Sequence, residues 1–187
     1  MRKLTSKTER EKKQKRNQII VGVVLIAVMF FSVVGYGFMD NGDVSKKVNY
    51  KGFDFISQNS LWFTQIGGFT FAFRKNPSEI DAVESPLNYL NSYSGKPLYI
   101  SAIDKESEVE ITSNMRQVVQ RIQYACFDEG NCGEGLPIKT CSDNFIIIEE
   151  FETNEIVQIE NCVFIRGEKD KLVDLSDEFL FKILGIR

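Results

Sequence analysis

The chain has 187 residues, with 23 Lys and Arg, 26 Asp and Glu, a formal net charge of −3 and no histidine. Without histidine it lacks the commonest general base, the Ser-His and Cys-His nucleophile pairs and most catalytic zinc sites. The tail, residues 1–18, holds 8 basic and 2 acidic residues, which leaves 15 basic and 24 acidic residues, a net −9, in the remainder. An acidic remainder argues against a nucleic-acid partner.

An uncharged stretch, Ile19–Met39, follows the basic tail. At ~1.5 Å per helical residue it can cross a ~30 Å hydrocarbon core, so we expect a transmembrane helix that contacts the lipid bilayer over residues 19–39. Because Lys and Arg gather before this stretch, we expect the tail in the cytoplasm and the C-terminal domain outside the cell membrane. A cleaved signal peptide is the alternative, although its apolar core is usually ~7–15 residues long and no A-x-A-like site follows here.

Residues 40–47 are expected to form a linker, and residues 48–187 a single external domain. Alternating aromatic residues predict a strand over residues 49–56, with a bulge at Gly52.

The next predicted unit is a hairpin with strands over 61–66 and 69–74, joined by Gly67-Gly68 in a type I′ turn. Pairing Ile66 with Phe69 sets the register, in which Thr64 lies opposite Phe71. This register gathers five large side chains on one face: Trp62, Ile66, Phe69, Phe71 and Phe73. Trp62 is a candidate binding surface, but an aromatic residue in such a face usually belongs to the core.

Two Pro-containing segments resemble helix starts. Residues 76–79 (Asn-Pro-Ser-Glu) predict a short turn, and Ser85-Pro86 predicts a short helix through Tyr93 that Gly95 stops. The apolar run 98–103 predicts an inner strand.

Apolar residues at helical spacing predict a helix over 111–126, capped by Thr112 or Ser113. Strands over 145–151, 155–159 and 162–166 predict a three-stranded meander with tight turns. A last helix is expected over 169–184 and ends at Gly185. These elements predict an α+β fold, in which an N-terminal transmembrane helix precedes one domain of mostly antiparallel sheet with packed helices.

Four cysteines lie in the expected external domain, which predicts two disulfides with three connectivities open. We favour Cys126–Cys132, which closes the small loop, and Cys141–Cys162, which joins the loop before the meander to its last strand. A zinc site and free thiols are the alternatives, but the cysteine spacing lacks the close ligand pairs of structural zinc sites.

A Gly-rich loop carries oxygen-bearing side chains that are candidate ligands for a cation such as Ca²⁺: Asp128, Glu129, Asn131 and Glu134. Their spacing does not match an EF-hand, and acidic loops are usually just solvated.

Further along the chain, Glu149, Glu150 and Glu152 alternate across a strand end, so they form no obvious acid–base pair. No nucleotide-binding, hydrolase or metalloprotease motif occurs. The sequence therefore predicts no catalytic residue, no bound metal and no cofactor.

Several short motifs resemble those of uncharacterised archaeal single-pass membrane proteins with an external α+β domain. They are Tyr50-Lys51-Gly52-Phe53, Trp62-Phe63 with the Gly-Gly hairpin, Asn76-Pro77-Ser78-Glu79, Leu136-Pro137 with Cys141, Asn161-Cys162-Val163 and Leu184-Gly185-Ile186. The resemblance implies a cell-surface location and supports the pairing of Cys141 with Cys162. It implies no activity.

The sequence thus favours a membrane-anchored domain outside the cell, held at the membrane by residues 19–39, that binds or assembles other membrane or envelope proteins. A histidine-independent hydrolase that uses carboxylates or a bound cation is the alternative, and a pocket holding two or more carboxylates with raised pKa values would favour it. A third hypothesis is an accessory subunit that contacts its partners through residues 19–39, although these residues lack a G-x-x-x-G face.

Overall fold

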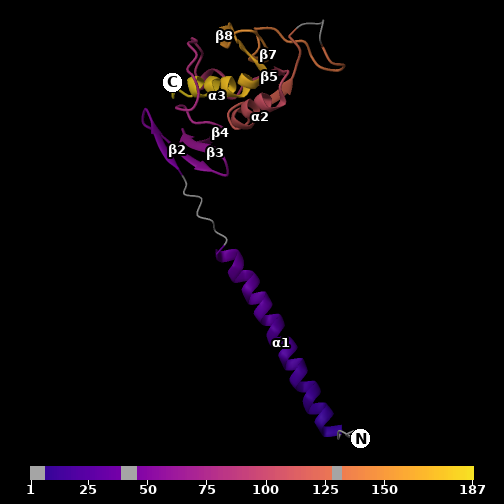
Figure 1. The fold of residues 1–187 in the computed structure, drawn as a ribbon. Coiled ribbons are helices and arrows are strands. Elements are labelled where there is room, and N and C mark those ends of the chain that lie inside the picture. Colours follow the sequence, from indigo (N-terminus) through magenta and orange to yellow (C-terminus); the bar gives the residue numbers. More distant parts are fainter. Residues whose placement is uncertain (1–6, 39–45, 128–131) are drawn as a thin grey trace. The chain divides into compact units, whose positions relative to one another are not determined.

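The computed structural model describes residues 7–38, 46–127 and 132–187 (Figure 1). It divides into two compact units, Met1–Val44 and Ser45–Arg187. The predicted linker lies largely outside the described residues.

The first unit contains a single helix, α1 (Lys7–Phe38), of 32 residues. Its described side chains are those of residues 15–31, so the last part of the expected span, residues 32–39, lies outside them. Within the part of the chain that the structure describes, no helix combines the length and the apolar character needed to cross a membrane.

The second unit is an α+β domain with two sheets. Its elements are β1 (Lys47–Tyr50), β2 (Phe53–Gln58), β3 (Leu61–Ile66), β4 (Phe69–Phe73), η1 (Leu90–Ser92), β5 (Pro97–Ala102), α2 (Lys105–Met115), β6 (Arg121–Tyr124), β7 (Phe145–Glu150), β8 (Glu155–Ile159), β9 (Cys162–Gly167), η2 (Lys169–Lys171) and α3 (Leu172–Ile183).

Sheet A is antiparallel, with the strand order β1-β2-β3-β4. The predicted hairpin register is confirmed, because Ile66 pairs with Phe69 and Trp62 with Phe73. The predicted single strand over 49–56 is wrong: the chain turns at Lys51 and Gly52, whose φ values of 47° and 92° form a second type I′ hairpin between β1 and β2.

Sheet B has the order β6-β5-β7-β9-β8, and its strands β6, β5, β7 and β9 run parallel to one another. Only β8 is antiparallel, paired with β9. The prediction of a mostly antiparallel sheet and of a three-stranded meander is therefore wrong for this half of the domain. The apolar run Phe145–Ile148 is buried throughout, as is typical of a parallel strand covered on both faces.

Helices α2 and α3 lie side by side between the two sheets (Figure 1). Phe181 of α3 packs against Phe73 of sheet A, with ring centroids 4.6 Å apart. On its other side α3 contacts β7 and β9 of sheet B. Because α3 is the middle layer, even its polar residues Ser176, Asp177 and Glu178 are buried.

The helix predicted over 111–126 begins and ends earlier than expected, at Lys105 and Met115. Asp104 caps it, with its carboxylate accepting a hydrogen bond from Ser107 N at 2.8 Å. Thr112 and Ser113 therefore lie inside the helix, and the apolar residues after Met115 lead into β6.

The Pro-containing segment over 76–93 forms less helix than predicted. Residues 76–79 make only the turn, closed by a bond from Asn76 N to the Glu79 carboxylate at 2.8 Å. The second predicted helix shortens to η1. The last helix matches its prediction, with α3 preceded by η2 and followed by Gly185 at a φ of 73°.

Candidate binding surface

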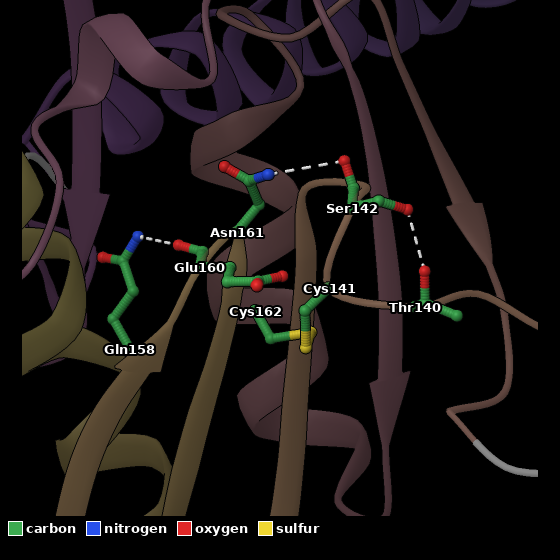
Figure 2. The surroundings of a disulfide bond; sticks show 7 residues. All are labelled: Thr140, Cys141, Ser142, Gln158, Glu160, Asn161 and Cys162. Carbon is green, nitrogen blue, oxygen red and sulfur yellow. Dashed lines mark hydrogen bonds between the residues drawn. A yellow bond between two sulfur atoms is a disulfide. The ribbon is translucent and has the colours of Figure 1, made fainter.

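Two disulfides stabilise the second unit, and both match the favoured pairing. Cys126 is joined to Cys132, and Cys141 to Cys162. Figure 2 shows that the second bond ties the segment before β7 to the start of β9. The side chain of Asn161 adds a hydrogen bond to Ser142 O at 3.3 Å. Disulfides form and persist in oxidising compartments, so the two bonds indicate an extracellular location.

The candidate cation ligands lie mainly outside the description. Asp128, Glu129 and Asn131 belong to the undescribed residues 128–131, and Glu134 is exposed. Among the described residues, no three acidic or cysteine side chains gather in a way that would hold a metal ion.

Trp62 belongs to the core and is 8% exposed. It lies in the cluster of buried side chains that sheet A shares with α2, α3 and sheet B. The structure therefore supports the core interpretation of Trp62 and gives no support to its use as a binding surface.

A groove lies on the face of sheet A that points away from the helices. Its volume is about 480 Å³. The side chain of Ile56, 45% exposed, lies across from Phe63 in the strand register and forms an apolar floor with it. The groove is lined by Lys47, Gly52, Phe53, Asp54, Ile56, Phe63, Thr64, Gln65 and Thr70.

The charged groups at one side of this groove neutralise each other. Asp54 accepts a hydrogen bond from Asn49 at 2.8 Å and forms an ion pair with Lys47 at 3.0 Å. The hydrogen bond from Asn49, followed by that from Lys47, lowers the pKa of Asp54. This side of the groove is therefore polar but carries no net charge.

The two edges of sheet A differ. On β4, the side chain of Asn114 bonds both backbone groups of Ala72, and Gln117 bonds Thr70 O at 2.8 Å. Asn114 of α2 and Gln117, just after the helix ends, thus take the place of a further strand.

The opposite edge, β1, has no neighbouring strand on its outer side among the described residues. Because Ser57 N donates to Lys46 O at 2.8 Å, the alternation of an antiparallel pair turns the backbone groups of Lys47 and Asn49 away from β2. Sheet A thus presents one closed edge and one open edge.

Carboxyl groups with raised pKa values lie elsewhere, at buried positions of α2 and α3. Burial, followed by the neighbouring charge of Glu110, raises the pKa of Asp177 to about 10. Burial also raises the pKa of Glu110, and that of Glu178, although Arg187 beside it acts in the opposite direction. None of the three carboxyls lines a groove described in the domain. They therefore give the hydrolase alternative no support.

The glutamates at the end of β7 take part in surface ion pairs. Arg166 Nε donates to Glu149 at 2.5 Å and Nη1 to Glu155 at 3.3 Å. Glu150 lies 3.9 Å from Lys169. Glu149 and Glu150 thus point to opposite faces, as the strand alternation predicts.

Comparison of the chain with protein-family models, with curated proteins and with solved structures finds no match. The interpretation of its function therefore depends on the sequence pattern and on the geometry described above.

Proposed function

We propose that the chain is a single-pass membrane protein that presents its disulfide-bonded domain outside the cell, where it binds an extended segment of another membrane or envelope protein. The observation that carries the binding proposal is the open edge of β1 beside the groove of sheet A. The two disulfides support the outside location.

Support for the membrane anchor comes from helix α1 and its sequence. The stretch Ile19–Met39 contains no charged residue, and a run of ~20 apolar residues suffices to span a bilayer. The large apolar side chains described between Ile19 and Phe31 are 53–77% exposed. Such a surface on every side of a helix is costly in water and favourable in lipid.

The anchor and its orientation are tested together in cells that express the full chain. We expect the protein to stay in the membrane pellet after alkaline carbonate extraction, and protease added to intact cells to degrade the C-terminal domain. Release into the supernatant would overturn the anchor. A domain protected until the cells are lysed would overturn the orientation.

The mode of binding follows from the geometry of sheet A. An open antiparallel edge offers N–H and C=O groups to which an extended peptide can pair as a further strand. Side chains of such a peptide would alternate between the outer face of sheet A, where the groove lies, and the face toward the helices. The groove's apolar floor and uncharged polar side favour a segment with small apolar residues at every second position.

Strand addition is tested by removing one outward N–H group. The Lys47→Pro variant deletes the outward N–H of residue 47. Lys47→Ala is the matched control, because it loses the same ion pair with Asp54 but keeps the N–H. We expect complexes cross-linked in native membranes with the full chain to persist in Lys47→Ala and to disappear in Lys47→Pro, while thermal unfolding shows that both variants fold. Complexes of equal yield in the two variants would overturn binding at β1.

A further inference from the structure

A small pocket lies where the C-terminal end of α3 meets the segment over residues 85–89. Its volume is about 180 Å³. The residues that line it are Ser85, Pro86, Leu87, Tyr89, Lys182 and Arg187. Two segments that lie far apart in the sequence thus form this pocket, and its described lining contains two basic residues and no acidic residue.

The two basic side chains of the pocket lie close together. Both approach the carboxylate of Glu178: Arg187 Nη1 donates to it at 2.7 Å, and Lys182 Nζ is 3.9 Å from it. The side chains of Lys182 and Arg187 are only 17% and 9% exposed. Because one carboxylate balances two cations, these three side chains carry one positive charge in excess.

Several polar groups of the lining residues have no hydrogen-bond partner among the described residues. Lys182 Nζ is too far from Glu178 for a hydrogen bond. Arg187 donates to Glu178 through Nη1 and to two backbone carbonyls through Nη2, but its buried Nε has no partner. The buried Ser85 hydroxyl has none either. Since buried donors are normally paired, a ligand with several acceptor oxygens would satisfy groups that this part of the protein leaves unpaired.

Both walls of the pocket are held in place by hydrogen bonds. Val83 N donates to Glu178 at 3.3 Å, and Asn88 N donates to a side chain of β8 at 2.7 Å, so the segment that contains residues 85–87 is fixed on both sides. On the other wall, the last carbonyl groups of α3 accept hydrogen bonds from Gly185 N and Ile186 N, which reduces their repulsion of an anion. Donors held in this way bind a ligand with little loss of side-chain entropy.

We propose that this pocket binds one oxyanion group, a phosphate or a carboxylate, through the ammonium of Lys182 and the unpaired donors of Ser85 and Arg187. An ammonium supplies a point charge with three donors, and the hydroxyl and the guanidinium N–H add directed hydrogen bonds. The pocket volume of about 180 Å³ is several times the ~30 Å³ share of one water molecule, so either group fits. This inference depends neither on the membrane anchor nor on strand addition at β1.

The test uses the purified full chain in micelles of a non-ionic detergent, with inorganic phosphate and acetate as separate probes. Sodium chloride at matched ionic strength controls for screening of surface charge. We expect saturable binding by calorimetry and a rise in the thermal midpoint that saturates over the same concentrations. Saturation with phosphate alone assigns a phosphoryl ligand, and saturation with acetate, alone or as well, assigns a carboxylate-bearing one. The absence of saturable binding to both probes would overturn the proposal.

Two variants link the binding to this pocket. Lys182→Gln and Ser85→Ala should each weaken the affinity for the saturating probe about tenfold, because each removes a donor to a charged group. Lys169→Gln is the control, at a lysine whose side chain is 76% exposed and does not line the pocket, and it should leave the affinity unchanged.

Both pocket variants should fold normally, because neither removes a hydrogen bond that the structure describes. Their thermal midpoints in the absence of a probe check this expectation. Arg187 is kept intact, since its ion pair with Glu178 stabilises the domain. An affinity unchanged in Lys182→Gln, or weakened equally in Lys169→Gln, would overturn the assignment of the anion to this pocket.

Discussion

The side chain of Asn114 on α2 bonds both backbone groups of Ala72 on β4. Its Oδ1 accepts from Ala72 N at 2.9 Å, and its Nδ2 donates to Ala72 O at 2.7 Å. The amide thereby reproduces the two hydrogen bonds of a neighbouring strand. Asn114 is 2% exposed, so water cannot replace it easily.

We expect Asn114→Ala to lower the free energy of unfolding by about 2 kcal/mol, because it leaves two partly buried backbone groups without partners. Gln117→Ala is the matched control: its bond to Thr70 O is exposed, and its loss should cost less than about 1 kcal/mol. Chemical denaturation measures both values. Equal losses of unfolding free energy in the two variants would contradict the interpretation that Asn114 closes the β4 edge of sheet A.

The buried carboxyl of Asp177 predicts a dependence of stability on pH. Its pKa rises from 3.8 to about 10 in the folded chain. Stabilisation by the protonated form is thus complete below about pH 4 and is lost as the pH rises toward 10. The groups that face Asp177 are Glu110 of α2, Lys75 through its backbone N–H, and Asp174 on its own helix.

We expect the free energy of unfolding to fall between about pH 5 and about pH 9, with a slope of up to about 1.4 kcal/mol per pH unit for one proton. Asp177→Asn should flatten this slope, because the amide stays neutral and can still accept from Lys75 N. Asp170→Asn, on exposed η2, should leave the slope as it is. An unchanged slope in Asp177→Asn would assign the pH dependence to other groups.

A buried ion pair fastens residues 77–83 to α3. Arg187 Nη1 donates to Glu178 at 2.7 Å, where the two side chains are 9% and 1% exposed. Arg187 Nη2 donates to Ile80 O at 3.0 Å, and Val83 N donates to Glu178 at 3.3 Å.

Arg187→Ala should therefore destabilise the domain by about 3 kcal/mol or more, since it leaves the buried carboxylate of Glu178 without its ion-pair partner. Lys182→Ala is the control, because Lys182 lies 3.9 Å from Glu178 and makes no hydrogen bond to it. Limited proteolysis should cut residues 77–83 faster in Arg187→Ala alone. Similar cleavage rates in the two variants would show that the ion pair does not hold residues 77–83 on α3.

The two disulfides should contribute unequally to stability. Cys141 and Cys162 are separated by 21 residues in sequence, and Cys126 and Cys132 by 6. The entropy of loop closure predicts that replacing the first pair with alanines lowers the free energy of unfolding by about 3 kcal/mol, and replacing the second pair by about 2 kcal/mol. Denaturation of the two double variants compares them. A larger cost for the Cys126–Cys132 pair would mean that loop entropy does not dominate.

Local signals in the sequence were sufficient for several elements. Gly67-Gly68 between alternating strands determined the β3–β4 register, because a two-residue turn leaves one pairing. Helix α3 followed from apolar residues at helical spacing and from Gly185, which stops it. The disulfides followed from loop closure among few cysteines.

Other features depend on contacts between distant segments. Apolar residues continue at helical spacing from Met115 to Ile122, so periodicity alone predicted a helix that runs into β6. The capping pair Asp104 and Ser107 marks the start of α2 in the sequence. The short turns after β7 suggested a meander, whereas β9 pairs with β7 in parallel.

The surroundings of individual polar residues could not be predicted from the sequence either. Arg121 and Lys139 reach Tyr99 because β5 and β6 pair in parallel and because Ile138 forms a bridge to Cys126, just beyond β6. Asp177 lies off the apolar spacing of the last helix, so its burial follows only from the position of α3 as a middle layer.

The order of strands in the two sheets also determines when each can assemble during synthesis. In sheet A every neighbour is the next strand in the chain, so each hairpin can close as soon as it emerges from the ribosome. In sheet B, β5 lies between β6 and β7, both made later, and β7 waits for β9. A half-synthesised chain therefore carries the apolar strand Leu98–Ile100 with both edges unpaired. In this nascent chain the exposed strand can bind a chaperone or pair with an aggregation-prone neighbour.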